Sequence, residues 1–137
     1  MAKTFSGGCQ CRGIRYETDA DAMAMVKCHC RDCQRASGSG YAPAIALPAA
    51  AVTITGTPRY YKTVGDAGKG IERGFCPTCG SQLLLKFDRM PDMVAIQAAS
   101  LDDPSLFNPR VDIFTSSAWA WDPISPSTEH RPRGMFD

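Results

Sequence analysis

Three cysteines within six residues form the densest group of chemically active side chains in this 137-residue sequence: Cys28, Cys30 and Cys33. A disulfide between Cys28 and Cys30 would have to close across one residue, where the required Cα separation and torsion are hard to reach. Three thiolates from one loop instead suit a tetrahedral metal ion and leave its fourth position open, as in catalytic zinc sites. We therefore interpret Cys28, Cys30 and Cys33 as ligands of a catalytic metal ion.

The other four cysteines form two close pairs, Cys9 with Cys11 and Cys76 with Cys79. The spacing of Cys76 and Cys79, followed by Gly80, is typical of a zinc knuckle. A structural zinc site needs four ligands, so Cys9 and Cys11 are the natural partners of this knuckle. A partition in which one of the four completes the group of three would break up a good four-ligand site. Buried thiols without metal are an alternative, but all seven share this close spacing.

The nature of the metal follows from the donor atoms. Sulfur-rich sites suit zinc, and they also suit copper(I) or an iron–sulfur cluster. The group of three lacks the spacings usual for clusters. We therefore expect two zinc ions per chain, one structural and one catalytic.

Polar residues surround the group of three. His29 lies between two of the cysteines and could be a fourth ligand or a proton carrier, although such a residue more often packs away from the metal. Arg31 and Asp32 are expected to be solvated charges. Arg35 has the same interpretation, or it meets an anionic substrate at the open site.

Backbone and hydroxyl donors follow shortly after in the sequence. Ser37, Gly38 and Gly40 could supply such donors to the open site. His130 lies in a proline-rich tail, and we expect it on the surface.

The elements that must position these residues are short strands separated by turn signals. We expect strands at residues 14–18, 23–27, 41–47, 52–55, 59–63, 71–75, 81–87, 93–99 and 111–115. A turn at residues 56–58 predicts a hairpin between the fourth and fifth strands. A helical turn at residues 34–37 should stop at Gly38, residues 64–70 should form a mobile loop, and the tail from Trp119 should be extended. The pattern predicts an all-β protein with very little helix.

Length and composition narrow the functional classes. The chain is expected to be a single domain, residues 1–137, with the 44% hydrophobic and 21% charged residues of a soluble globular protein. A net charge of +1 argues against nucleic-acid binding. No apolar run approaches the roughly 20 residues of a membrane span. Residues 1–8 lack the features of a signal peptide, so we expect a cytoplasmic location, where thiols stay reduced.

Several motifs carry a resemblance to a known family. They are residues 8–11, 14–16, 28–35, 37–38, 75–81 and 101–104, together with Trp121. With these motifs the chain resembles the glutathione-dependent formaldehyde-activating enzyme (GFA) family over nearly its whole length. The resemblance implies antiparallel sheets arranged as a β-tent. It also implies a structural zinc on Cys9, Cys11, Cys76 and Cys79, and a catalytic zinc on Cys28, Cys30 and Cys33.

The resemblance implies an activity as well. The family's named reaction condenses formaldehyde with glutathione to S-hydroxymethylglutathione, which is a carbon–sulfur lyase reaction in reverse. Two positions depart from the family pattern: Arg12 stands where many members have glycine, and Asp112 where we expect histidine.

Three functions are compatible with these residues. The first is the lyase reaction on the glutathione adduct, with a small-molecule thiol as the partner and Arg35 binding the substrate. The second is the same chemistry on a different thiol adduct. The third is a binding module in which both zinc ions are structural, which would require a fourth protein ligand in the group of three and would leave no pocket.

Overall fold

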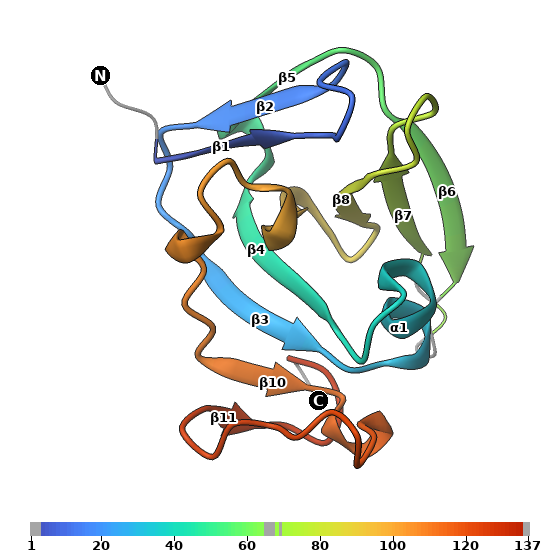
Figure 1. Cartoon of the computed structure of the whole chain (residues 1–137), viewed down its shortest axis with the longest axis vertical. Coiled ribbons are helices and arrows are strands. Elements are labelled where there is room, and N and C mark those ends of the chain that lie inside the picture. Colours follow the sequence, from blue (N-terminus) through green and yellow to red (C-terminus); the bar gives the residue numbers. More distant parts are fainter. Residues whose placement is uncertain (1–3, 65–67, 69, 136–137) are drawn as a thin grey trace.

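The computed structural model describes residues 4–64, 68 and 70–135, which are built mostly of strands in two sheets with one α-helix (Figure 1). This confirms the all-β class with very little helix. No helix in these residues is long and apolar enough to cross a membrane.

The smaller sheet has three antiparallel strands in the order β1-β2-β5. They are β1 (Phe5–Gly8), β2 (Arg15–Thr18) and β5 (Val52–Thr55). Tyr16 and Thr18 are buried, whereas Arg15 and Glu17 face outward. This alternation follows from the strand pleat, which sends successive side chains to opposite faces.

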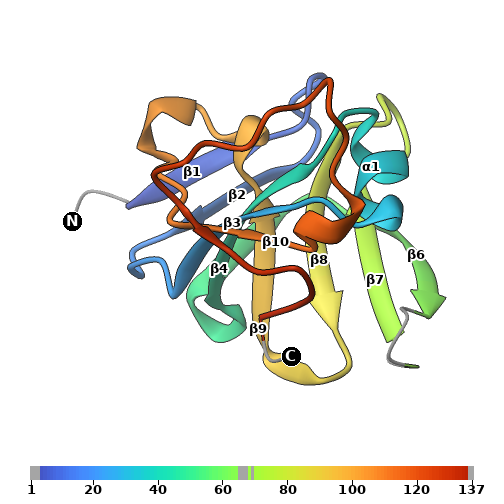
Figure 2. The same cartoon turned by 90° about the horizontal axis from the view of Figure 1, so that it is seen from below.

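The larger sheet has eight strands in the order β11-β10-β3-β4-β9-β8-β7-β6. Their bounds are β3 (Ala24–Cys28), β4 (Ala42–Pro48), β6 (Arg59–Val64), β7 (Gly70–Phe75), β8 (Gln82–Phe87), β9 (Met90–Gln97), β10 (Val111–Ile113) and β11 (Glu129–His130). Pairing is antiparallel except at β10, which runs parallel to both β3 and β11. Figure 2 shows the chain after β10, drawn in orange to red, passing α1, and Figure 1 shows β11 beside β10.

The predicted hairpin between residues 52–55 and 59–63 is wrong. Both strands exist, but β5 pairs with β2 in the smaller sheet, and β6 pairs with β7 in the larger one. The intervening turn therefore carries the chain from one sheet to the other. Gly56 adopts φ +90°, and a Cβ there would overlap with the carbonyl oxygen of Gly13, so the turn packs tightly against the loop before β2.

Other expectations hold with adjusted bounds. The helical turn is a seven-residue helix, α1 (Arg31–Ser37), which ends where Gly38 adopts φ +69°, as predicted. The last predicted strand ends at Ile113 because Phe114 takes a left-handed conformation and a 3-10 helix follows. Strands β1 and β11 were not predicted. Of the predicted loop at 64–70, residues 65–67 and 69 lie outside the described residues.

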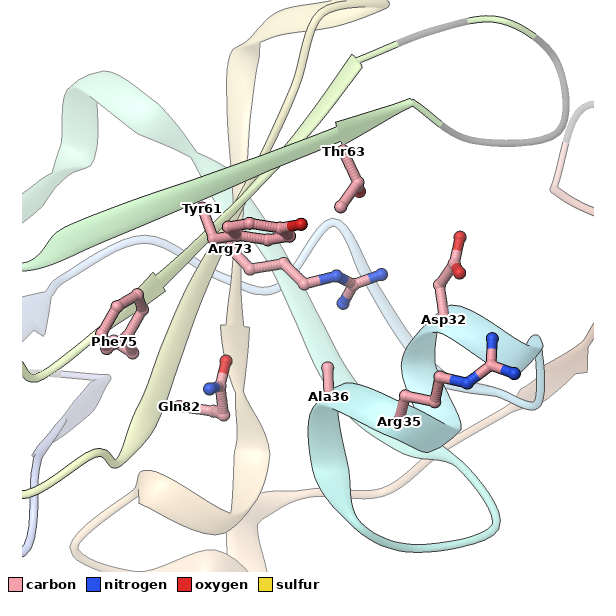
Figure 3. A pocket seen from close by; sticks show the side chains of 8 residues that line it. All are labelled: Asp32, Arg35, Ala36, Tyr61, Thr63, Arg73, Phe75 and Gln82. Atoms are coloured by element: carbon pink, nitrogen blue, oxygen red, sulfur yellow. The ribbon is translucent and has the colours of Figure 1, made fainter.

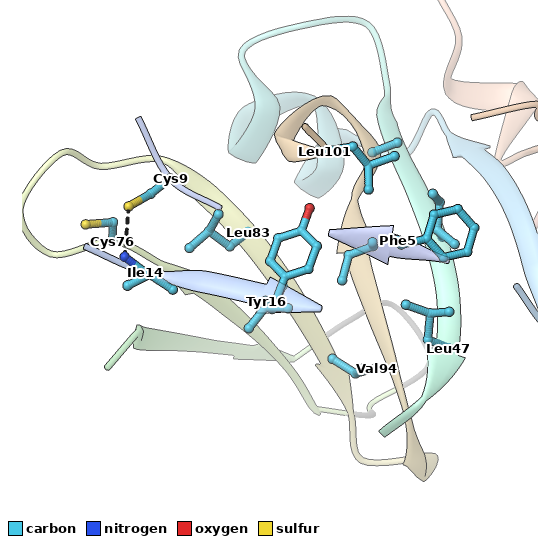
Figure 4. Close-up of a cluster of buried hydrophobic side chains, with 13 residues drawn as sticks. Phe5, Cys9, Ile14, Tyr16, Leu47, Cys76, Leu83, Val94 and Leu101 are labelled. Atoms are coloured by element: carbon cyan, nitrogen blue, oxygen red, sulfur yellow. Dashed lines mark hydrogen bonds between the residues drawn. The ribbon is translucent and has the colours of Figure 1, made fainter. Parts of the chain in front are cut away.

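The main core lies between the two sheets, where Phe5, Tyr16, Leu47, Leu83 and Leu101 pack together (Figure 4). A second apolar cluster, with Ala44, Leu85 and Ala95, covers the other face of the larger sheet. Strand β8 contributes to both clusters. This burial on two faces explains why its leucines are continuous instead of alternating.

Candidate metal centres

The four-cysteine group (Cys9, Cys11, Cys76 and Cys79) connects the two sheets. Cys9 and Cys11 lie in the turn between β1 and β2, and Cys76 and Cys79 lie in the turn between β7 and β8. All four sulfur atoms lie within 4.8 Å of one another. Sulfur atoms this close form a set that could hold one metal ion.

Local backbone geometry directs these sulfurs inward. The Ile14 amide donates to Cys9 Sγ at 3.3 Å, and the Cys79 amide donates to Cys76 Sγ at 3.4 Å. Gly80 adopts φ +79° and donates to the Cys76 carbonyl, which closes the knuckle. Donors of this kind favour the thiolate. A hydrogen bond from the Ser81 hydroxyl lowers the pKa of Cys79 to about 5.

The three-cysteine group (Cys28, Cys30 and Cys33) is built where a strand ends and a helix begins. Cys28 is the last residue of β3, Cys30 is the N-cap of α1, and Cys33 lies in the first helical turn. The Cys33 amide donates to Cys30 Sγ at 3.3 Å. The three sulfurs also lie within 4.8 Å of one another, and no fourth His, Cys, Asp or Glu among the described residues joins them.

Electrostatics of the three-cysteine group indicate what it can hold. Hydrogen bonds from the Cys28 and Cys33 thiols lower the pKa of Cys30 to about 2. The hydrogen bond to Cys30 is also the main cause that raises the pKa of Cys28. Cys28 lowers the pKa of Cys33, but Cys30 and burial outweigh it and raise that pKa to about 11. A thiolate at Cys30 thus raises the pKa of its two neighbours, and a bound cation would offset this repulsion. The donor set fits a thiophilic divalent ion such as zinc.

His29 packs away from the three-cysteine group. Its ring is buried, and Nε2 lies 2.7 Å from Asp112 Oδ1, a hydrogen bond in which the imidazole donates to the carboxylate. Burial raises the pKa of Asp112, but hydrogen bonds from His29 and Thr128 outweigh it and hold this pKa below its usual value. Asp112 therefore anchors the residue between two of the cysteines.

The chain after β10 contacts the segment that carries the three cysteines. Gln34 Nε2 donates to the carbonyl oxygens of His29 at 2.7 Å and Ser117 at 3.0 Å. Trp119 Nε1 donates to Gln34 Oε1 at 2.8 Å. The guanidinium of Arg31 lies 5.7 Å from the Trp119 ring, so Arg31 belongs to the contact with the tail.

A cavity of about 360 Å³ lies between α1 and the β6–β8 part of the larger sheet (Figure 3). It is lined by Asp32, Arg35, Ala36, Tyr61, Thr63, Arg73, Phe75 and Gln82. The side chain of the predicted substrate residue, Arg35, thus lines a pocket. Arg73 connects that pocket to the three-cysteine group, because its Nη atoms lie 3.9 and 4.0 Å from Cys33 Sγ.

Sequence reasoning missed Arg73. A usable signal exists, since Ile71, Arg73 and Phe75 alternate along one strand and the arginine takes a position where the pattern requires an apolar residue. A charge at such a position, three residues before a zinc knuckle, points to a functional role.

Two of the predicted donor residues, Ser37 and Gly40, lie against other parts of the chain. Ser37 donates to the Tyr41 carbonyl at 3.0 Å, and Gly40 packs against Asp122. Ser37 also borders a second cavity of about 520 Å³ lined by uncharged residues, among them Tyr41, Gln97 and Ser100. His130 is exposed, as expected.

Together, the two sheets and the two cysteine groups define a β protein with two candidate metal centres. The family model described as glutathione-dependent formaldehyde-activating enzyme matches residues 4–117, and the chain belongs to this family. A crystal structure of a Rhodobacter sphaeroides protein is similar, with a TM-score of 0.57 and 20% sequence identity over 77% of this chain and 92% of that one. This likeness supports the fold. Among proteins of curated function, none matches the chain.

Proposed function

We propose that this protein is a zinc-dependent carbon–sulfur lyase that acts on a thiol adduct such as S-hydroxymethylglutathione. One observation carries the proposal. The three-cysteine group is joined by no fourth His, Cys, Asp or Glu among the described residues, and it adjoins a pocket that contains two arginines.

The two cysteine groups differ in the way that structural and catalytic sites differ. The four-cysteine group supplies a complete tetrahedral set, as structural zinc sites do. The three-cysteine group supplies one ligand fewer, which leaves room for a substrate sulfur. A binding module with two structural metals would need a fourth ligand there, so the arrangement favours an enzyme.

The pocket suits a thiol that carries a carboxylate. Arg35 and Arg73 line it together with one carboxylate, Asp32, and with two aromatic rings, so its cationic groups outnumber its acidic one. A guanidinium can bind a carboxylate through two parallel hydrogen bonds. Glutathione has one thiol and two carboxylates, and it matches both features.

The chemistry requires an ionised sulfur. A metal ion held by Cys28, Cys30 and Cys33 would ionise an incoming thiol. In the cleavage direction the carbon–sulfur bond breaks, its electron pair stays on the glutathione sulfur, and the hydroxyl proton leaves as the aldehyde forms. Arg35 would hold the carboxylate end of the substrate during this exchange, and condensation reverses each change.

The test uses protein in which cobalt(II) replaces the native metal. Glutathione should change the visible absorption of cobalt, whereas S-methylglutathione, which has no free thiol, should not. Exchange between formaldehyde and S-hydroxymethylglutathione, followed by NMR, should be faster with the native protein than with the Cys30→Ser variant.

The outcomes separate the three candidate functions. A spectrum that no thiol changes would indicate a binding module. Thiol binding without faster formaldehyde exchange would indicate a lyase with a different adduct.

A further inference from the structure

Arg73 is a buried cation that forms no ion pair with a carboxylate of the described residues. It lies in the middle of β7 with a relative exposure of 7%. Among the described residues, no carboxylate forms an ion pair with it within 4.0 Å. Burying a charge is costly unless an opposite charge compensates it, so the surroundings of Arg73 must supply an anion.

Asp32 lines the same pocket, but among the described residues it forms no ion pair with Arg73 within 4.0 Å, whereas Arg73 contacts the three-cysteine group. Both Nη atoms of Arg73 are directed at Cys33 Sγ, at 3.9 and 4.0 Å. These distances are longer than the amide-to-sulfur hydrogen bonds of the cysteine groups, and they place the positive charge beside the sulfur. Three thiolates around a divalent ion carry a net charge of −1, which the +1 charge of Arg73 balances.

We propose that Arg73 is a positioning residue that neutralises the three-cysteine group through Cys33 and so sets its affinity for metal. The inference rests on the proposed function only in taking these cysteines as metal ligands. Arg35 lines the same pocket, but it is exposed, and the hydrogen bonds to Cys33 Sγ come from Arg73. The role is therefore specific to the arginine on β7.

The charge of Arg73 should affect the lone-pair energy of the Cys33 sulfur and the affinity for metal. N–H groups that point at a thiolate lower the energy of its lone pairs, and hydrogen bonds to ligands tune the affinity of metal sites. Without the cation, three thiolates are harder to hold together, and the metal should bind more weakly. A sulfur without these donors gives up an electron more easily, so its charge-transfer absorption should move to longer wavelength.

The experiment compares Arg73→Gln and Arg73→Lys with a matched control, Arg35→Gln, in cobalt-substituted protein without added thiol. The four-cysteine group is common to all variants and cancels in difference spectra. Arg73→Gln should shift the sulfur-to-cobalt charge-transfer band to longer wavelength. It should also lower the metal affinity of the three-cysteine group about tenfold, as measured by competition with a chelator. Arg35→Gln should leave both the position of the band and the metal affinity unchanged.

Arg73→Lys keeps the charge and tests the role even if Arg73→Gln fails to fold. Its band should lie to longer wavelength than that of the native protein, and its affinity should stay closer to native than that of Arg73→Gln. A band that coincides with the native one in the folded Arg73→Lys or Arg73→Gln protein would overturn the proposal. Equal shifts in Arg35→Gln would do the same. Because no thiol is present, these results do not depend on which thiol, if any, is the substrate.

Discussion

Arg35 and Arg73 lie in the same pocket, but their guanidinium groups have different surroundings. Arg73 is buried against a cysteine sulfur, so its charge is already engaged. Arg35 is exposed on α1, and its charge is available to a ligand. At the residue scale, substrate affinity should therefore depend on Arg35 and metal affinity on Arg73.

Replacing Arg35 with alanine should weaken the binding of glutathione by about ten- to a hundred-fold. The reason is the loss of a charge-assisted hydrogen bond that contributes about 1.5–3 kcal/mol. Binding of β-mercaptoethanol, which has no carboxylate, should barely change. Titrations of the cobalt-substituted protein with both thiols measure the difference.

Arg59→Ala is the matched control, because Arg59 is exposed on β6 and does not line the pocket. It should leave both affinities unchanged. Equal losses for both thiols in Arg35→Ala, or none for either, would remove Arg35 from the binding site.

Helix α1 depends on the elements around it. Seven residues are too few for a stable isolated helix. The N-cap Cys30, the left-handed Gly38 and the hydrogen bonds that link Gln34 to Ser117 and Trp119 all hold it in place. The tail is therefore part of the support of the three-cysteine group, although Trp119 lies 85 residues from Gln34 in the sequence.

Replacing Gly40 with alanine should displace the tail near Asp122. A Cβ at Gly40 would lie 2.7 Å from Cγ of Asp122, whose side chain is short and mostly buried. Overpacking of this kind costs about 1–3 kcal/mol of folding free energy. We expect a lower melting temperature and faster proteolytic cleavage between β10 and β11.

The exposed neighbour provides the control: Ser39→Ala should match the native protein in both measurements. If Gly40→Ala also matched it, the tail would have no close contact with the loop after α1.

At the scale of the whole molecule, the four-cysteine group links two sheets. Cys11 and Cys76 are 65 residues apart in sequence, and their sulfurs lie 3.7 Å apart. One metal ion there would connect the β1–β2 turn of the smaller sheet to the β7–β8 turn of the larger one. Such a link contributes folding free energy directly.

Cys79→Ser and Cys30→Ser should therefore fail in different ways. Cys79→Ser should unfold or become insoluble, because structural zinc supplies folding free energy. Cys30→Ser should stay folded, with one metal ion fewer and no response to thiols. Circular dichroism and the ratio of metal to protein distinguish the two variants.

Metal removal from the native protein should follow the same division. A chelator should take one ion from the three-cysteine group before the fold is lost. If Cys79→Ser and Cys30→Ser lost the fold equally, the assignment of one structural and one catalytic group would be wrong.

Much of this protein can be predicted from local sequence. The spacing places the seven cysteines in two pairs and one group of three, because ligands on one turn lie two or three residues apart to reach one ion, and the fold brings the two pairs together. Gly38 ends α1 as predicted, since glycine accepts a left-handed conformation without strain. Most strands are predicted for a similar reason: alternation along a strand is a property of the strand itself.

Only the tertiary structure decided which distant groups meet. Strand β5 alternates equally well beside β6 or β2, and the turn at Gly56 sends it to β2. Arg73 lies 40 residues from Cys33, and Asp112 lies 83 residues from His29. These partners are set by the packing of the two sheets and the tail, which no local pattern encodes. A buried charge in a strand shows that it needs a partner, and only the fold determines which residue that partner is.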